Sequence, residues 1–298
     1  MPDRPGVDRQ GAARKGDAVA VLGAGTMGID LALDLARQGY RVILKDASEA
    51  ALRTAEERLR QRYRFVKMIR GEVFPEPVGT LLERIALAGD YTGFDRTNIV
   101  LENITEDYEM KRRLYGELRD VCRADTLFGV NTSCISITRI GSLMPRPENV
   151  IGMHFLNPVP LKQLVEVVRG RCTSEDTLDR TRLFLTSLGK KCVVVNDMPG
   201  FVTNRVLMLT INECAWLVRD GVASAADVDT IFTAGFSHKM GPLATADLIG
   251  LDTILNSLAV LHESYRQAKY LPCPLLSEMV GGGLLGRKSG EGFFKYAG

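Results

Sequence analysis

Three histidines occur in the 298 residues, and one of them, His154, lies at the end of the apolar run Val150–Phe155. Histidine is the side chain that most readily takes and returns a proton near neutral pH. Twelve residues later, Glu166 is the lone charge of the apolar run 164–168. The intervening sequence Asn-Pro-Val-Pro at 157–160 favours a turn, because each proline fixes its own φ and restricts its predecessor. Such a turn can bring the carboxylate beside the imidazole, where it would set the tautomer and raise the basicity of the ring.

Each of these residues has a simpler interpretation when it is taken alone. His154 could be a satisfied core histidine, and Glu166 a charge on an edge strand that faces water. Together, and beside the nucleotide loop described next, they predict a general acid/base pair.

A glycine-rich loop, Gly23-Ala24-Gly25-Thr26-Met27-Gly28, follows an apolar run and precedes a helical pattern. Its glycines permit a tight turn, close approach of the backbone to a pyrophosphate, and packing of helix on strand. The free amides at the start of the helix then face the phosphates. The loop therefore predicts a dinucleotide site, with Gly23, Gly25, Thr26, Met27 and Gly28 as cofactor contacts.

Asp46 indicates which dinucleotide binds, because it ends a second β-rich run 18 residues after Gly28. A carboxylate there accepts hydrogen bonds from the adenosine ribose and repels a 2′-phosphate, which favours NAD over NADP. The alternative is that Asp46 only begins a turn or caps the next helix. With the general acid/base pair, an NAD site predicts hydride transfer from a hydroxyl-bearing carbon.

These side chains need a scaffold, and the first two thirds of the chain alternate β-rich and helical patterns. The alternation predicts an α/β fold, a Rossmann-type doubly wound and mostly parallel sheet over residues 17–197. The expected strands are 18–23, 41–46, 99–103, 127–132, 150–155, 164–168 and 191–195, and the expected helices are 26–39, 48–70, 107–120 and 174–188.

Residues 198–298 follow a helical pattern that is apolar on more than one face, as in a helix buried on several sides. We therefore expect an all-helical C-terminal domain that also forms a homodimer. Residues 1–16 have no apolar run and are expected to be a disordered tail rather than a signal peptide.

Composition excludes several other classes of protein. Lys and Arg total 38 against 36 for Asp and Glu, too balanced for a nucleic-acid binder. No apolar run approaches the roughly 20 residues that span a bilayer. The six cysteines form no Cys-x-x-Cys pair, so we expect reduced thiols, a cytoplasmic location and no metal site.

Several motifs, in order and spacing, resemble the 3-hydroxyacyl-CoA dehydrogenase family from Ala18 almost to the end of the chain. They are Gly23–Gly28, Asn131-Thr132-Ser133, 154–160, 164–167, 199–205, 240–243 and 286–290. The resemblance implies that His154 is the general acid/base and Glu166 its orienting partner, and that Ser133 and Asn204 hydrogen-bond the substrate. It implies cofactor contacts at Asp46, Glu106, Lys111, Ser133, Asn157 and Lys288.

Three of these residues also have simpler interpretations. Ser133 could cap a helix that begins near Ser136, Asn204 could be a polar residue of a first helical turn, and Lys288 could be a solvated loop charge. Two positions depart from the family. Cys134 replaces a second serine, as a small apolar substitute or a nucleophile, and Asn103 replaces a small apolar residue near the expected nicotinamide position.

The expected helix 48–70 is strongly basic in its C-terminal half. A solvated face is one interpretation; the other is a site for the phosphates of CoA or for an acidic carrier protein, with Arg62 and Lys67 as contacts. Residues 238–247 and 271–276 are similar to the family branch associated with polyketide extender units. That branch implies a small, glyceryl-type hydroxyacyl group on an acyl carrier protein, whereas the wider family implies a short 3-hydroxyacyl-CoA.

Two other functions remain open at this point. The chain could oxidise a free hydroxy acid or sugar acid, or it could be a catalytically silent NAD-binding structural protein. The presence of all four expected site residues, His154, Glu166, Ser133 and Asn204, argues against a silent protein.

Overall fold

The computed structural model describes residues 15–296, which form two compact units that divide between Asp197 and Met198. Of the expected tail 1–16, residues 1–14 lie outside the described residues, and the amide of Gly16 donates to the carbonyl of Gly39 at 2.9 Å.

The first unit contains an eight-stranded sheet in the order β3-β2-β1-β4-β5-β6-β7-β8. Neighbouring strands are parallel except β6 and β7, which are antiparallel. The strands are β1 Ala18–Leu22, β2 Arg41–Lys45, β3 Ile85–Ala88, β4 Ile99–Glu102, β5 Leu127–Val130, β6 Val150–Phe155, β7 Leu164–Arg169 and β8 Lys191–Asn196. This arrangement confirms the expected fold class. Sequence reasoning missed β3, because two of its four residues are exposed and two half-buried at the sheet edge, with no alternating pattern.

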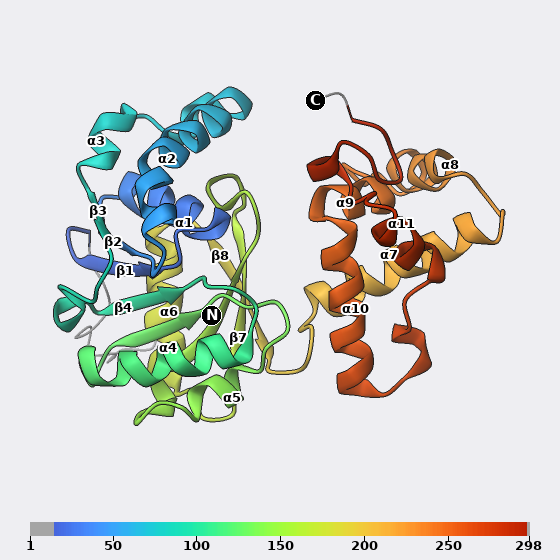
Figure 1. The fold of residues 1–298 in the computed structure, drawn as a ribbon. Coiled ribbons are helices and arrows are strands. Elements are labelled where there is room, and N and C mark those ends of the chain that lie inside the picture. The colour runs from blue at the N-terminus through green and yellow to red at the C-terminus, as the bar shows by residue number, and fades with distance from the viewer. Residues whose placement is uncertain (1–14, 297–298) are drawn as a thin grey trace, which may run out of the picture. The chain divides into compact units, whose positions relative to one another are not determined.

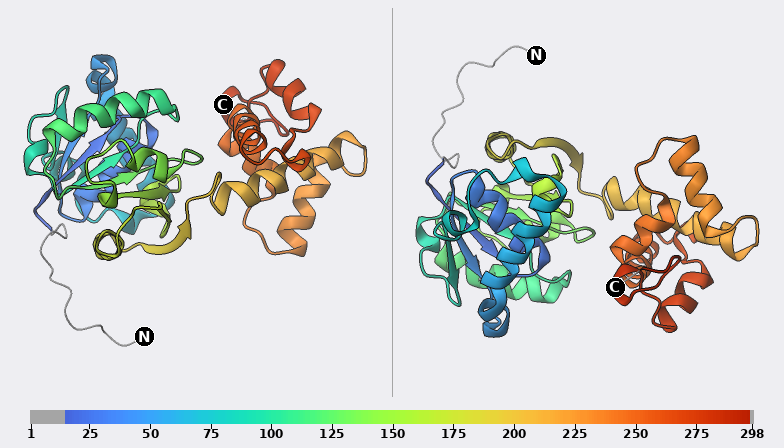
Figure 2. Two further views of the ribbon diagram at one scale, coloured as in Figure 1. Left: turned by 90° about the horizontal axis from the view of Figure 1, so that it is seen from below. Right: turned by 90° about the horizontal axis from the view of Figure 1, so that it is seen from above.

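Helices cover both faces of this sheet (Figures 1 and 2). They are α1 Thr26–Arg37, α2 Glu49–Ile69, α3 Val78–Leu82, α4 Tyr108–Val121, α5 Ile137–Gly141 and α6 Glu175–Ser187. One apolar core joins α1, α2 and α6 to the sheet, whereas α4 and α5 pack together beside the other face. Four of the helices begin at a side chain that caps the first turn; the caps are Ser48, Asp107, Ser136 and Ser174.

The strand order reverses direction between β1 and β4, which lie side by side at the middle of the sheet. In open α/β sheets, ligands bind beyond the carboxyl ends of the strands at such a reversal. The fold therefore places a binding site next to the glycine loop that follows β1.

The second unit is all-helical over its described residues, Met198 to Tyr296. It contains α7 Thr203–Arg219, α8 Ala225–Thr230, a π-helical turn Ile231–Gly235, α9 Pro242–Ile249, α10 Leu251–Tyr265 and α11 Pro274–Gly281. Its core is built from apolar side chains of α7, α9, α10 and α11. Within residues 15–296 no single helix has the length and hydropathy to cross a membrane; α9 and α10 meet that test only as a pair bent by 97°.

Candidate active site

His154 and Glu166 lie directly opposite each other on the antiparallel strands β6 and β7. Opposite residues of an antiparallel pair point to the same face of the sheet, so the two side chains meet. His154 Nδ1 lies 2.9 Å from Glu166 Oε2, and the two residues are only 7% and 5% exposed. An ionised carboxylate can only accept, so this contact favours the tautomer in which Nδ1 donates and Nε2 presents a lone pair. The turn that the proline-rich segment predicts is the connection that produces this pairing.

Ser133 faces the other nitrogen of this imidazole, with its Oγ 3.3 Å from His154 Nε2. The loop that carries it is held by one carboxylate oxygen of Glu106. That oxygen accepts from Thr132 Oγ1 at 2.5 Å, from the Ser133 amide at 3.0 Å and from the Cys134 amide at 2.9 Å. Ser136, not Ser133, caps α5, so the alternative interpretation of Ser133 as a helix cap is wrong.

The three loop glycines differ in what a Cβ would meet. A Cβ on Gly28 would lie 1.7 Å from the carbonyl oxygen of Gly23, so the helix could not pack against the loop. Gly23 has a φ of 93°, and its Cβ would lie 2.7 Å from the carbonyl oxygen of Asn103. A Cβ on Gly25 would meet nothing within 4 Å, so Gly25 leaves open the space that a pyrophosphate would occupy. Thr26 and Met27 form the first turn of α1 beside it.

Asp46 stands at the end of β2 and shapes the same loop. Its Oδ2 accepts from the amide of Ala24 at 2.7 Å and its Oδ1 from the amide of Ser48 at 2.8 Å. The turn that was the alternative interpretation is therefore present, and the half-buried carboxylate still lines the adjoining cavity. Its position fits an acceptor for ribose hydroxyls.

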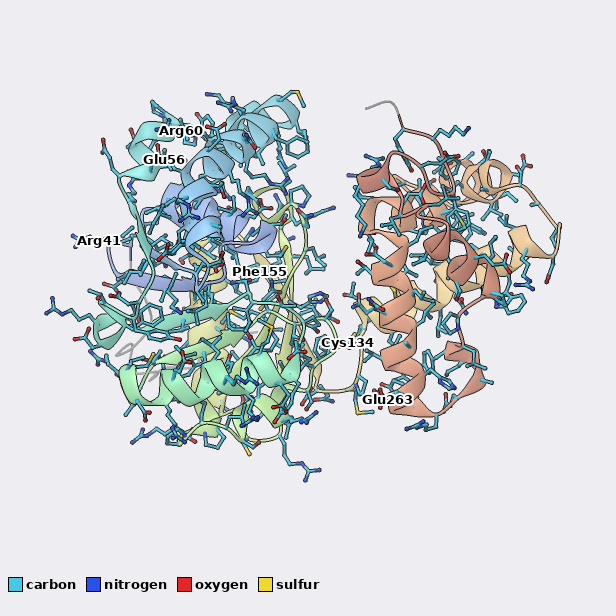
Figure 3. The ribbon with its side chains drawn as sticks, viewed as in Figure 1. Arg41, Glu56, Arg60, Cys134, Phe155 and Glu263 are labelled. Carbon is cyan, nitrogen blue, oxygen red and sulfur yellow. The ribbon has the colours of Figure 1, made fainter. Side chains whose placement is uncertain are left out.

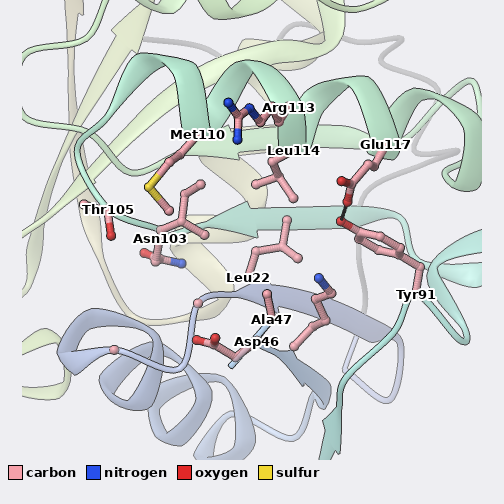
Figure 4. A pocket seen from close by; sticks show the side chains of 14 residues that line it. Leu22, Asp46, Ala47, Tyr91, Asn103, Thr105, Met110, Arg113, Leu114 and Glu117 are labelled. Atoms are coloured by element: carbon pink, nitrogen blue, oxygen red, sulfur yellow. Dashed lines mark hydrogen bonds between the residues drawn. The ribbon is translucent and has the colours of Figure 1, made fainter. Parts of the chain in front are cut away.

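This cavity has a volume of about 390 Å³ and lies between the glycine loop and α4 (Figure 4). Its walls are mainly apolar, as the flat face of a nucleobase requires. Tyr91 closes one end: its hydroxyl lies 2.5 Å from Glu117, and Lys45 Nζ lies 4.3 Å from its ring centre. Burial, followed by the hydrogen bond to Glu117, raises the pKa of Tyr91, so its hydroxyl stays protonated as a donor. The residues present thus fit the adenosine half of a dinucleotide.

Lys111 was expected to contact the cofactor directly, but in the structure it contacts Glu102. Its ammonium is fully buried and donates to both carboxylate oxygens of Glu102, at 2.6 and 2.8 Å. The side chain has no exposed surface for a ligand. Lys111 instead neutralises Glu102, which in turn accepts from the amide of Ile104 in the cavity wall at 2.8 Å.

Arg62 was expected to contact a substrate carrier, but in the structure it is bound to Asp30 and Asn157. Its guanidinium makes two hydrogen bonds to Asp30, which is fully buried in α1, and a third to Asn157 Oδ1 at 2.5 Å. Asp30 additionally accepts from the amide of Val159 at 2.8 Å. Arg62 therefore ties α1 to the segment after His154 and holds Asn157 in place. Lys67 is exposed, with its Nζ 3.2 Å from the Tyr63 hydroxyl, and remains a predicted carrier contact.

The remaining two expected residues belong to the second unit. Asn204 lies in the first turn of α7, and Lys288 is paired with Asp252 at 2.5 and 2.6 Å. Their contacts with substrate and cofactor remain predictions.

Sequence reasoning missed two polar side chains that organise the site. Asp30 is one of two fully buried aspartates of α1, with Asp34, and its place among apolar neighbours in the sequence was the available signal. Asp197 accepts from Ser136 Oγ at 2.7 Å and from the amides of Ile137 and Thr138 at 3.1 and 2.7 Å, which holds the start of α5. In the sequence, Asp197 precedes Met-Pro-Gly at 198–200, where the alternating pattern of strands and helices ends, and nothing there indicated its contacts with α5.

Comparison with known proteins identifies relatives over nearly the whole chain. The family described as 3-hydroxyacyl-CoA dehydrogenase, NAD binding domain, matches residues 18–198, and its C-terminal domain matches 200–296. A probable 3-hydroxybutyryl-CoA dehydrogenase of Bacillus subtilis is 40% identical over 278 residues, which cover 93% of this chain and 96% of the relative. The 3-hydroxybutyryl-CoA dehydrogenase of Bradyrhizobium diazoefficiens is 39% identical, covering 94% and 95%.

Solved structures agree with these relatives. FadB2 of M. tuberculosis superposes with a TM-score of 0.89 at 36% identity, covering 94% of this chain and 98% of that one. The (S)-3-hydroxybutyryl-CoA dehydrogenase PaaH1 of Ralstonia eutropha has a TM-score of 0.86 at 36% identity, covering 94% and 99%.

Proposed function

This chain belongs to the 3-hydroxyacyl-CoA dehydrogenase family, and we propose that its His154–Glu166 pair carries the proton transfer that interconverts a small 3-hydroxyacyl thioester and its 3-oxo form. The chain is an NAD-dependent oxidoreductase of the 3-hydroxybutyryl-CoA dehydrogenase type. The observation that carries the proposal is the buried contact of 2.9 Å between His154 Nδ1 and Glu166.

The proposed proton path uses the two ring nitrogens of His154 in different ways. His154 Nε2 takes the proton of the substrate hydroxyl, and Glu166 stabilises the imidazolium that forms. A bound NAD would supply the hydride acceptor for the carbon that bears this hydroxyl. In the reverse direction the imidazolium returns its proton to the oxygen. Ser133 Oγ, 3.3 Å from Nε2, lies where it can hydrogen-bond that oxygen and orient it.

Steady-state turnover tests this assignment. Wild-type protein should reduce NAD with 3-hydroxybutyryl-CoA, and His154→Ala should lose turnover by about 10²-fold or more while it still binds NADH. An active His154→Ala variant would show that another residue is the base.

The same assay separates the two other functions. Preference for the free hydroxy acid over its thioester, at equal concentration, would overturn the thioester proposal. NADH binding without turnover of any thioester would favour a catalytically silent protein.

The acyl group of the substrate is bound to a carrier, and the names of the relatives support CoA as that carrier. An acyl carrier protein is a second candidate, because the end of α2 exposes apolar side chains among its cations. Phe65, Met68 and Ile69 are 41%, 77% and 53% exposed. Phosphates of CoA require cations alone, whereas a protein docks on apolar and charged residues together.

The charges of this helix suit an acidic partner. Arg60 pairs with Glu56 one turn earlier at 2.7 Å, and Arg64 pairs with Glu57 at 3.1 Å. Figure 3 labels Arg60 and Glu56 on α2. Exposed pairs of this kind contribute little to stability, so their arginines can exchange partners at small cost. A small glyceryl-type group on such a carrier would then be the substrate.

Comparing one acyl group on both carriers decides between them. If the carrier protein docks here, Met68→Asp should lower kcat/KM for the protein-bound thioester about tenfold and leave the CoA thioester unaffected. Arg53→Glu, in an exposed pair with Glu49 at the other end of α2, is the matched control. Equal use of both thioesters, insensitive to Met68→Asp, would exclude docking at this helix.

We further propose that the second unit forms a homodimer. Val206 on α7 and Leu271 are 59% and 48% exposed, as apolar side chains at an interface would be in a separate chain. Light scattering should give twice the chain mass, and Val206→Glu should lower it. The cytoplasmic location expected from the sequence remains a prediction.

A further inference from the structure

Two asparagines connect the carboxyl ends of three neighbouring strands in the first unit. Asn103 follows β4 and Asn131 follows β5, and both are half-buried. Asn131 Nδ2 donates to Asn103 Oδ1 at 2.8 Å, and Asn131 Oδ1 accepts from the amide of Phe155 at 3.1 Å. Asn103 Nδ2 donates in turn to the carbonyl of Leu101 at 3.1 Å. A continuous polar chain thus runs from β4 through β5 to the last residue of β6.

These hydrogen bonds lie where the β5–β6 ladder has already ended. The ladder between the two strands ends at Val130 and Gly152, two residues before His154. Beyond that point β6 continues its ladder with β7 on the other side. The Asn131 side chain therefore restrains, from the β5 side, the segment that presents His154.

The orientation of Asn131 depends on Asn103. The oxygen and nitrogen of an asparagine amide point in different directions from one planar group. Asn131 Oδ1 can face the Phe155 amide while its Nδ2 meets an acceptor, and Asn103 Oδ1 supplies that acceptor at 2.8 Å. An apolar side chain at position 103 would leave Nδ2 without it.

Asn103 also belongs to the cofactor cavity. Its amide donates to the carbonyl of Leu22 at 2.8 Å, and its side chain lies in the cavity wall at the opposite end from Tyr91 (Figure 4). One residue therefore contacts the cavity and, through Asn131, the strand end beside His154.

We propose that Asn103 is a positioning residue, which through Asn131 fixes the end of β6 that carries His154 relative to the cofactor cavity. This inference rests on the proposed dehydrogenase function. A displacement of about 1 Å can lower a rate on the order of 10²-fold. Because β7 and Glu166 still hold the other side of His154, we expect a smaller loss in kcat, about tenfold, when the Asn103 acceptor is removed.

Two substitutions at this position separate the hydrogen bond from the packing. Asn103→Leu keeps the size of the side chain and removes the acceptor, and it should lower kcat about tenfold with KM for the thioester changed less than about threefold. Asn103→Asp keeps an oxygen for Asn131 and should restore kcat, although its charge should raise KM for NAD. A purely structural role would change the unfolding temperature without this division between kcat and KM.

Amide hydrogen exchange in the protein without NAD provides a readout that does not depend on turnover. Exchange of the Phe155 amide should accelerate at least about tenfold in Asn103→Leu and in the smaller variant Asn103→Ala, and return toward wild type in Asn103→Asp. The Gly152 amide, which faces β7 because amides alternate sides along a strand, is the internal reference. Unchanged Phe155 exchange and unchanged kcat in Asn103→Leu would overturn the proposal, as would failure of Asn103→Asp to restore them. Absence of turnover in the wild type would overturn the proposed function instead, since the exchange result is independent of it.

Discussion

Replacement of Lys111 by methionine tests whether this lysine binds the cofactor or supports the fold. Methionine fills similar volume but leaves the Glu102 carboxylate, which is fully buried, without its cation. Breaking a buried ion pair by removing one partner costs about 3–5 kcal/mol of unfolding free energy.

The pH dependence of this loss has a definite sign. Burial raises the pKa of Glu102, and the Lys111 ammonium lowers it. Without Lys111 the folded-state pKa rises further above the unfolded value, so the variant is destabilised increasingly as pH rises. Lowering the pH from 7 to 5 should therefore recover part of the variant's loss of unfolding free energy relative to wild type.

Urea unfolding at the two pH values, together with NADH titration, measures both roles. The double variant Glu102→Gln/Lys111→Met keeps an acceptor for the amide of Ile104, and it should regain most of the stability and bind NADH within about threefold of wild type. Arg112→Met, which removes an exposed pair with Glu109 on the same helix, should change little. Weak NADH binding in the double variant, with unfolding unaffected in Lys111→Met, would refute the structural role and restore Lys111 as a cofactor contact.

Other substitutions test the pair, the cofactor choice and the loop. Glu166→Gln should lower kcat by about 10²-fold or more while NADH binding persists, because the imidazole loses its orienting carboxylate; unchanged kcat would remove Glu166 from the proton path. Asp46→Ser should raise the NADP-to-NAD ratio of kcat/KM at least about tenfold, since the carboxylate that repels a 2′-phosphate is gone, and an unchanged ratio would contradict that role. Gly28→Ala should lower the unfolding temperature, because its Cβ would lie 1.7 Å from a backbone oxygen. Gly25→Ala should leave the unfolding temperature unaffected and weaken NADH binding, and normal binding would show that the pyrophosphate lies elsewhere.

Much of the scaffold was predictable because it is encoded locally. Strands and helices alternate in a pattern that determines a parallel sheet, and the spacing from the glycine loop to Asp46 marks a nucleotide unit. The prolines between His154 and Glu166 predict a reversal of the chain, which makes the two strands antiparallel. His154 and Glu166 are paired directly opposite each other on these strands, so their side chains meet. β3 had no comparable signal, since a short edge strand without a fully buried residue has little apolar pattern to detect.

Local patterns thus predicted the order of most elements and the residues able to do the chemistry. The partners of the polar side chains became known from the folded chain. Lys111 hydrogen-bonds Glu102, 9 positions away in the chain, and Arg62 hydrogen-bonds Asp30, 32 positions away. Asn103 accepts a hydrogen bond from Asn131, 28 positions away. The physical reason is that periodicity specifies which face of an element is buried, whereas the partner of a buried charge or amide depends on which other element packs there. A residue of the type expected to contact a ligand can therefore instead bind another side chain of the protein and hold the site in place.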